Sequence, residues 1–299
     1  MPTWNKVLQE ITEKEKAGHQ SVDLVRRAYL LKLNRHTKRN IIAYYSGWLT
    51  KPPQTPNMTI GDDDLNGFMS VVHALDRSRG LDLLLHTPGG DIAATEALVS
   101  YLWKMFDRDL RVIVPQLAMS AGTMVACAAR TIVMGKQSSL GPIDPQLNGL
   151  PAQGVLEEFQ VAIKQVEHEP ASLPIWQAII GKYHPTFLWE CQQAIQWASQ
   201  MVENWLANNM FAGRQTSVND AKKVVEFLSN HDITKSHSRH ISFDKCLEIG
   251  LNIELLENDN KFQDLVLTVH HAYMLTIAKT QTIKIIENHK GIALVTLSG

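Results

Sequence analysis

Short apolar runs alternate with amphipathic segments through the first half of the chain. The apolar runs are rich in β-branched, leucine or aromatic residues and cover residues 40–48, 81–86, 110–115 and 131–134. Between them, apolar side chains recur at helical spacing in residues 62–77, 91–106 and 120–130. Buried strands that alternate with helices are typical of a parallel sheet with right-handed crossovers. The pattern therefore predicts an α/β fold with a parallel sheet as its core.

The pattern changes near residue 150 and becomes mainly helical. Long helical patterns cover residues 155–166, 175–182 and 186–209. A final unit follows, with an expected helix, strand and helix at 242–250, 251–255 and 259–279, and the tail 290–299 is expected to add an edge strand. We therefore expect one catalytic-type domain over residues 40–299, with a helical insertion at about 150–235.

The first 39 residues are expected to form an N-terminal helical arm. Trp4, Val7, Leu8 and Ile11 fall on one face at helical spacing. Such a face docks on the chain's own core or on a neighbouring subunit more often than on a membrane.

Composition narrows the class of protein. The chain has 299 residues, of which 44% are hydrophobic and 20% charged, as expected of a folded globular protein rather than a disordered one. Its formal net charge of −1 provides no overall positive field for a nucleic acid or an anionic membrane. The sequence therefore predicts neither a nucleic-acid partner nor a membrane anchor.

Cysteine and histidine usage predicts a reduced protein without a metal. The three cysteines, Cys127, Cys191 and Cys246, are widely spaced and form no Cys-x-x-Cys pair, which fits a reducing compartment. No signal-peptide pattern opens the chain, so we expect a cytoplasmic location. No His-Glu-x-x-His or paired Cys/His spacing occurs, so we expect no catalytic metal and no cofactor.

Two loops at expected strand ends hold the residues whose groups can take part in catalysis. The first is His86-Thr87-Pro88-Gly89-Gly90-Asp91, whose paired glycines can point backbone N–H groups into a cleft. The second is Ala118-Met119-Ser120-Ala121-Gly122-Thr123, where the Ser120 hydroxyl is placed at a helix start. Taken alone, the first loop reads as a plain turn and Ser120 as a helix cap. Together they follow successive strands of one sheet, where ligands of α/β folds gather, which favours a site.

Three motifs in order carry a resemblance to a known family. Thr87-Pro88-Gly89-Gly90, Met119-Ser120-Ala121-Gly122-Thr123 and Leu140-Gly141-Pro142-Ile143-Asp144-Pro145-Gln146 resemble the serine dehydrogenase proteinase family. That family is a branch of the Clp/crotonase superfamily related to signal peptide peptidase A, and the resemblance runs from about residue 41 to 271. It implies a ClpP/crotonase-like spiral fold, a nucleophile at Ser120 and assembly into a homo-oligomer. It also implies an oxyanion hole from backbone N–H groups of Gly89, Gly90 and Ala121.

The sequence offers several candidates for the general base. Clp subunits carry a histidine soon after the serine, but the corresponding stretch here contains Asp144 and no histidine. Signal peptide peptidase relatives instead use a lysine, whose burial lets it act as a neutral amine. Lys164 and Lys182 fall in the expected part of the chain, and we favour Lys182 because it interrupts a helical pattern among apolar neighbours.

Two other groups compete for this role. The segment His237-Ser238-Arg239-His240 offers two histidines, and Asp244 nearby could orient one of them as in a hydrolase triad. The alternative for this segment is a polar loop that caps the next helix. Asp144 is held between proline residues and is expected either to position substrate or to cap a turn.

The sequence thus predicts a serine peptidase, with a Ser-Lys dyad favoured over a Ser-His-Asp triad. It would hydrolyse peptides or unfolded proteins and need no ATP of its own. Two alternatives stay open: an inactive oligomeric scaffold that binds peptides, and a crotonase-type acyl-CoA enzyme. Four tryptophans of the helical region are expected to pack helices or subunits or to line a peptide-binding groove: Trp176, Trp189, Trp197 and Trp205.

Overall fold

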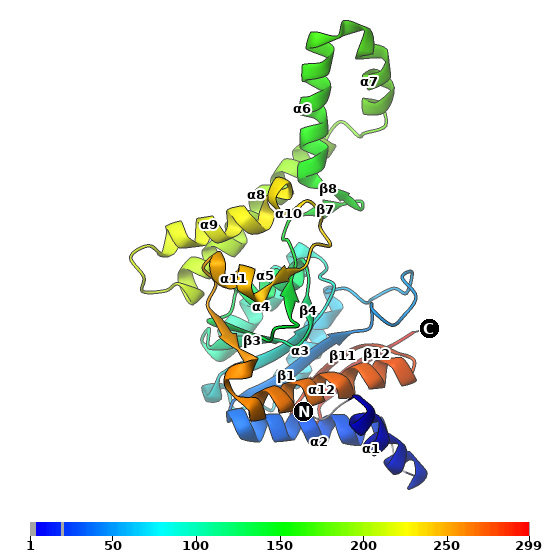
Figure 1. The fold of residues 1–299 in the computed structure, drawn as a ribbon, viewed down its shortest axis with the longest axis vertical. Helices are drawn as coiled ribbons and strands as arrows, with labels where there is room; N and C mark the ends of the chain where they lie inside the picture. The colour runs from blue at the N-terminus through cyan, green and yellow to red at the C-terminus, as the bar shows by residue number, and fades with distance from the viewer. Residues whose placement is uncertain (1–3, 19–20, 299) are drawn as a thin grey trace.

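The computed structural model describes residues 4–18 and 21–298 and contains a seven-stranded sheet within them (Figure 1). The strand order is β10-β5-β3-β2-β1-β11-β12. Strands β10 to β1 of this order pair in parallel, and β11 and β12 are antiparallel to their neighbours. The strands are β1 (Asn40–Ser46), β2 (Leu81–His86), β3 (Leu110–Val114), β5 (Thr131–Met134), β10 (Ile253–Leu255), β11 (Thr282–Asn288) and β12 (Ala293–Leu297). The predicted α/β class with a parallel core is confirmed.

Helices cover both faces of this sheet, so alternate strand residues enter different cores. On β2, Leu83 and Leu85 pack with helices α3 (Asp63–Val72), α4 (Ile92–Phe106) and α5 (Ala121–Cys127). Leu84 faces the opposite way, into the core beneath α2 (Ser21–Thr37) and α12 (Asn260–Lys279). A strand buried on both faces has no polar side to present, which explains why it reads as a continuous apolar run.

The N-terminal helix α1 (Trp4–Lys16) packs on α2 and α12. Its residues Val7 and Ile11 are fully buried against Ala272 and Leu275. The apolar face expected from the sequence therefore docks on the chain's own helices.

Charged side chains are buried where β11 meets these helices. Glu287 is 0% exposed and receives hydrogen bonds from Arg26 Nε at 2.6 Å and from Tyr273 Oη at 2.8 Å. Burial by itself lowers the pKa of Arg26, but the hydrogen bond and charge of Glu287 raise it above its ordinary value. The pair thus satisfies two charges that could not stay buried singly.

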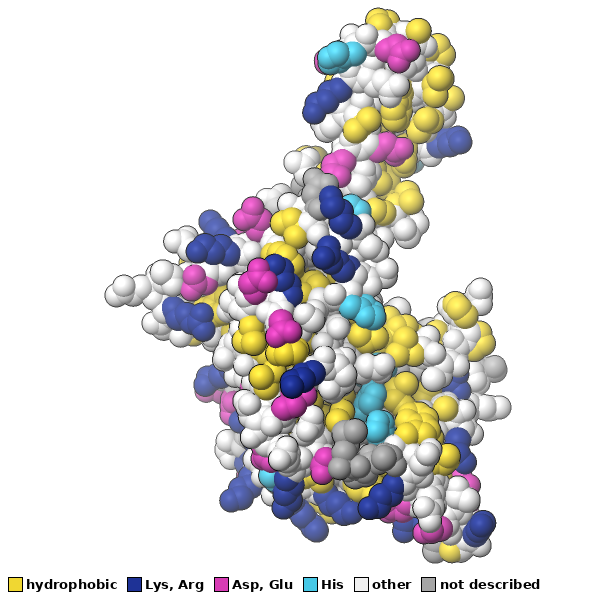
Figure 2. Space-filling model, in the orientation of Figure 1, with side chains coloured by type: hydrophobic (Ala, Val, Ile, Leu, Met, Phe, Trp, Pro, Cys, Tyr) yellow, Lys and Arg dark blue, Asp and Glu magenta, His cyan; other side chains and the backbone are white. Residues whose placement is uncertain are grey.

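The helical region forms a hairpin that stands away from the body of the molecule (Figure 1). It consists of α6 (Ala152–His168), a short 3₁₀ turn η2 (Pro170–Ser172) and α7 (Leu173–Ile180). No residue of α7 is buried, and Ile175 is 65% exposed. Hydrophobic side chains accordingly cover much of the hairpin surface (Figure 2). From there α8 (Phe187–Trp205) returns to the body, and α9 (Ser217–Ser229) packs on α8.

Several short elements complete the chain. Two small sheets lie beside the main one, formed by β4 (Leu117–Ala118), β6 (Ser139–Leu140) and β9 (Ile241–Ser242), and by β7 (Gln146–Leu147) with β8 (Leu150–Pro151). The remaining helical turns are η1 (Arg77–Arg79), the π-turn η3 (Leu206–Met210), α10 (His231–Thr234), α11 (Phe243–Glu248) and η4 (Leu256–Asn258).

Most predicted elements of the core appear, with differences in strand pairing and in the ends of two helices. The edge strand expected at the tail is β12, and it pairs with β11, which the hydrophobic pattern did not indicate. The helix expected over 62–77 stops at Val72, and the one expected at 120–130 covers only Ala121–Cys127. No helix in the described part of the chain is long and apolar enough to cross a membrane.

Candidate active site

Ser120 occupies a sharp turn between β4 and α5. Its backbone has φ 51° and ψ −118°, a positive φ that is costly for a residue with a Cβ atom. The turn is fixed from both sides, because Met119 N donates to Thr87 O at 3.0 Å and Thr123 Oγ1 donates to Ala118 O at 2.9 Å. Although Ser120 precedes a helix, its side chain makes no capping hydrogen bond. The hydroxyl is therefore not used as a cap.

The paired glycines of the first loop pack directly against this turn. Gly89 has φ +105°, and a Cβ there would lie 2.7 Å from Ser120 Cβ and 2.9 Å from Ala121 N. At Gly90 a Cβ would lie 2.2 Å from the carbonyl oxygen of Ile60. Only glycine allows these close backbone approaches.

Backbone hydrogen bonds decide which N–H groups of this loop remain available. Gly89 N donates to Thr87 Oγ1 at 3.2 Å, so that N–H is already engaged. Ile60 bridges the loop by donating to Gly89 O at 2.8 Å and accepting from Asp91 N at 2.9 Å. Within the described residues, the N–H groups of Gly90 and Ala121 donate no hydrogen bond. These two are the donors open to a ligand.

A pocket of about 370 Å³ opens in front of Ser120. The glycine loop forms one wall, and residues of the 144–147 segment, α8 and the loop before β9 form the others. It is lined by Thr59, Pro88, Gly89, Gly90, Asp91, Ile92, Ser120, Met124, Pro145, Gln146, Leu147, Ala194, Trp197 and His237.

His237 enters this pocket with its ring held by a buried carboxylate. Its Nδ1 lies 2.8 Å from Asp144 Oδ1, and the Asp144 side chain is 0% exposed. Gln146 Nε2 donates to the other oxygen, Oδ2, at 3.1 Å, and His231 Nδ1 lies 3.8 Å from that same oxygen. With Nδ1 engaged, Nε2 is the nitrogen of His237 that is left for the pocket.

Comparison with known proteins identifies the family of the chain. The family model described as "ClpP-like SDH-type serine proteinase" matches residues 19–265. The chain belongs to this family. The family resemblance expected from the three motifs is thereby confirmed, and with it a ClpP-like fold.

The relatives with curated sequences carry no described activity. The chain is 29% identical to the uncharacterized protein MJ0137 of Methanocaldococcus jannaschii over 192 residues, which are 64% of this chain and 59% of that protein. It is 34% identical to MJ1495 of the same organism over 107 residues, which are 36% of each chain. The matched region thus spans well under two thirds of these relatives, and no solved structure matches.

The structure separates the candidates for a general base in this family member. Lys182 is exposed in the turn between α7 and α8, and Lys164 is exposed on α6. His240 is exposed just before β9. None of the three lines the pocket within a single chain, whereas His237 does.

At the pocket, the carboxylate that pairs with a histidine is Asp144. Asp244, which the sequence suggested could orient a histidine, lies exposed in the first turn of α11 and does not line the pocket. Asp144 and His237 are 93 positions apart. Sequence reasoning named both residues and missed their pairing, because no local signal connects segments so distant in the chain.

A second group of histidines is buried behind the glycine loop. His86 ends β2 and is 0% exposed, with its ring centroid 4.3 Å from that of Trp48. Burial lowers the pKa of His86 to about 3 and also lowers that of His270, 5.3 Å away between ring centroids. Both rings are therefore neutral at ordinary pH. Within the described residues no group of three or more His, Cys, Asp or Glu side chains could hold a metal ion.

Proposed function

We propose that this member of the serine proteinase family hydrolyses peptide bonds with Ser120 as nucleophile and His237 as general base. The observation that carries the proposal is the His237–Asp144 pair, which faces the pocket that Ser120 also lines. The pair supports His237 as a base, because its ring is held by Asp144 and it lines the same pocket as a hydroxyl that has no capping role. The fold, with a nucleophile at a strand end beside a glycine loop, supports the same reading.

The reaction follows from these positions. The Ser120 Oγ atom attacks the peptide carbonyl carbon while its proton passes to Nε2 of His237. The oxyanion that forms accepts hydrogen bonds from the unengaged N–H groups of Gly90 and Ala121. His237 then returns the proton to the departing amine, and the C–N bond breaks to leave an acyl group on Ser120. Water, deprotonated by His237, hydrolyses that ester and regenerates the serine.

Asp144 acts through His237 in this scheme. Its carboxylate accepts the Nδ1–H group and thereby selects the tautomer whose Nε2 lone pair faces the pocket. It also stabilises the imidazolium that forms once the proton is taken. Because Asp144 is fully buried and also bonded to Gln146, its position does not depend on solvent.

We also propose that the protein acts as a homo-oligomer on peptides or unfolded segments in the cytoplasm. The apolar and wholly unburied helix α7 supports assembly, since large exposed apolar surfaces are rare on monomers. Lys182 lies just after that helix, so assembly could bring the Lys182 side chain of one subunit to the Ser120 pocket of another.

The test is intact-mass analysis after reaction with a serine-directed fluorophosphonate. We expect one adduct per chain, absent in Ser120→Ala and formed at least 100-fold more slowly in His237→Ala, because a positioned base contributes about 10²- to 10⁴-fold. His240→Ala is expected to react like the wild type. Loss of reactivity in Lys182→Ala but not in His237→Ala would transfer the base to the lysine. Absence of any adduct in the assembled protein would overturn the peptidase proposal in favour of a binding scaffold or an acyl-CoA enzyme.

A further inference from the structure

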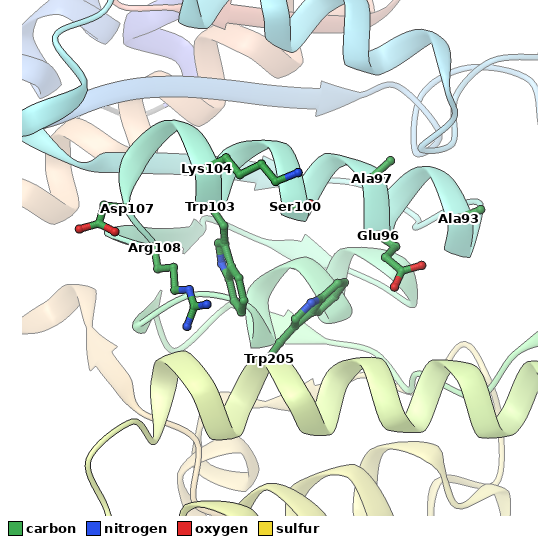
Figure 3. A pocket seen from close by; sticks show the side chains of 9 residues that line it. All are labelled: Ala93, Glu96, Ala97, Ser100, Trp103, Lys104, Asp107, Arg108 and Trp205. Carbon is green, nitrogen blue, oxygen red and sulfur yellow. The ribbon is translucent and has the colours of Figure 1, made fainter.

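A second and larger hollow lies between helices α4 and α8 (Figure 3). It has a volume of about 740 Å³ and we call it the α4–α8 groove. Small or short side chains of α4 form one wall, and two tryptophans from the facing helices close the far end. It is lined by Ala93, Glu96, Ala97, Ser100, Trp103, Lys104, Asp107, Arg108 and Trp205.

The groove and the catalytic pocket lie next to each other along α4 and α8. Asp91 and Ile92, at the start of α4, line the pocket, and Ala93 is the next residue and lines the groove. On the α8 side, Trp197 lines the pocket, and its Nε1 donates to Glu96 Oε2, at 3.2 Å, in the groove. The same two helices therefore bound both hollows, one after the other.

The tryptophans at the far end are held in place from behind. Trp103 and Trp205 approach from opposite helices, with ring centroids 6.4 Å apart and planes at 63° (Figure 3). Trp103 Nε1 donates to Ala128 O at 3.0 Å, and the Arg108 guanidinium lies 4.9 Å from the Trp103 ring centroid. Trp205 is 6% exposed and belongs to the core, whereas Trp103 is half-buried, so Trp103 is the ring that offers a bound chain contact area at little cost in conformational entropy.

We propose that the α4–α8 groove binds an extended segment of the polypeptide substrate on one side of the bond that Ser120 cleaves. The proposal rests on the proposed function and assigns a substrate class to it: unfolded segments rather than dipeptides or tripeptides. The occupant follows from continuity, because a chain with its scissile carbonyl at Ser120 can leave the pocket along this groove.

The dimensions of the groove set the length of that segment. From Ile92 to Lys104 the helix rises about 18 Å, at 1.5 Å per residue. An extended chain advances about 3.3 Å per residue. The groove therefore accommodates about five or six substrate residues, with an apolar side chain of the substrate over Trp103.

Charges at the far end favour a carboxylate on the substrate. Lys104 and Arg108 line the groove together with two acids, Glu96 and Asp107, and the Lys104 side chain runs along α4 toward Ser100 (Figure 3). Within the described residues, neither Lys104 nor Arg108 forms an ion pair with a carboxylate of the chain. An acidic side chain or a terminal carboxylate at the distal substrate position would supply that partner.

The test fills the groove with a bulky side chain and compares long and short substrates. Ser100 is exposed on α4, one turn before Trp103, so Ser100→Trp places an indole in the groove without disturbing the core. Ser70→Trp is the matched control, because Ser70 is equally exposed on a helix, α3, and lines neither hollow. A sequence cleaved in β-casein would first be identified by mass spectrometry and then synthesised as peptides of four and twelve residues.

We expect the ratio of kcat/KM for the long peptide to kcat/KM for the short one to fall at least tenfold in Ser100→Trp, mainly through KM. Ser70→Trp is expected to keep the wild-type ratio. An unchanged ratio in Ser100→Trp would overturn the proposal, and so would a shift in oligomeric mass, measured by light scattering, that assigns the groove to a second copy of the chain. Long peptides that end in an amide, in lysine or in glutamate distinguish binding of a terminal carboxylate from binding of a side-chain carboxylate. Equal KM values for all of these peptides would show that the groove does not recognise a substrate carboxylate.

Binding without turnover makes the two proposals independently testable. Fluorescein-labelled β-casein would be titrated, by fluorescence anisotropy, with Ser120→Ala protein carrying either Ser100→Trp or Ser70→Trp. We expect binding at least tenfold weaker with Ser100→Trp. If the wild type forms no fluorophosphonate adduct but this difference persists, the peptidase proposal fails and the groove stands. Equal binding by the two proteins, or no binding by either, overturns the groove.

Discussion

Replacement of Asp144 by asparagine is the sharpest test of how the site works. The substitution keeps the size and shape of a side chain that is 0% exposed, but it turns one acceptor oxygen into an NH₂ donor. At present two groups donate to the carboxylate, His237 from one side and Gln146 from the other. An amide can accept from one of them only.

The expected loss follows from the tautomer of His237. If the amide NH₂ faces Nδ1, that nitrogen must accept, and the ring proton then sits on Nε2, where it cannot remove a proton from Ser120. If the amide oxygen faces Nδ1, the tautomer is correct but the buried negative charge that stabilises the imidazolium is gone. Loss of this function is worth about 10³- to 10⁴-fold in rate, which is about 4 to 5.5 kcal/mol in the activation free energy.

Measurement of kcat/KM on a cleaved peptide, with the rate of fluorophosphonate labelling, gives this number. Asp244→Asn is the matched control, since Asp244 is exposed in α11 and pairs with no residue of the pocket. Thermal unfolding of both variants separates a loss of chemistry from a loss of fold. A folded Asp144→Asn protein within threefold of Asp244→Asn in kcat/KM would refute the role of Asp144 in orienting His237.

Three further predictions concern the glycine loop, the buried histidines and the ion pair under the sheet. Gly90→Ala would place a Cβ 2.2 Å from Ile60 O, so we expect loss of labelling at Ser120 of at least 100-fold with the far-UV circular dichroism retained, and normal labelling would contradict the close packing of this loop. The pKa of His86 is about 3 in the folded state and about 6.5 when unfolded, so the unfolded state gains a proton first as the pH falls. Urea unfolding should therefore show a loss of about 2 kcal/mol between pH 6.5 and pH 5 from this residue, which His86→Phe should lack; an identical pH dependence in both proteins would disprove it. Glu287→Gln leaves the 1%-exposed Arg26 with only the partly exposed Asp23 as a counter-charge and should lower the free energy of unfolding by about 3 kcal/mol, whereas a change below 1 kcal/mol would show that the pair does not matter.

The core strands could be read from the sequence because each is buried on both faces. The apolar runs at 81–86 and 131–134 coincide with β2 and β5, because consecutive apolar residues dominate both strands even though Asp82 and His86 of β2 are polar. Strand β11 has the same burial but was missed. Lys284 and Glu287 interrupt its apolar pattern, and both are buried only because Asp64 and Arg26 neutralise them. Such compensation is a property of the folded chain and leaves no local trace in the sequence.

Some residues of the candidate site could likewise be predicted from the sequence, and others could not. Ser120 and the paired glycines could be predicted, because close backbone approach leaves glycine at fixed places beside the serine. The link between Asp144 and His237 could not, because it joins segments on either side of the whole helical insertion. The preference for Lys182 rested on an interrupted helical pattern. The structure explains that interruption as the turn that ends the hairpin, where the lysine is exposed to solvent.

The backbone conformation of Ser120 also has a cost in stability. A side chain with a Cβ atom at φ 51° and ψ −118° costs on the order of 1 to 3 kcal/mol, and glycine would remove most of that cost. Glycine would therefore be the more stable residue at this position, but it would lack the hydroxyl. Ser120 therefore carries a conformational cost that its hydroxyl does not offset by capping the helix.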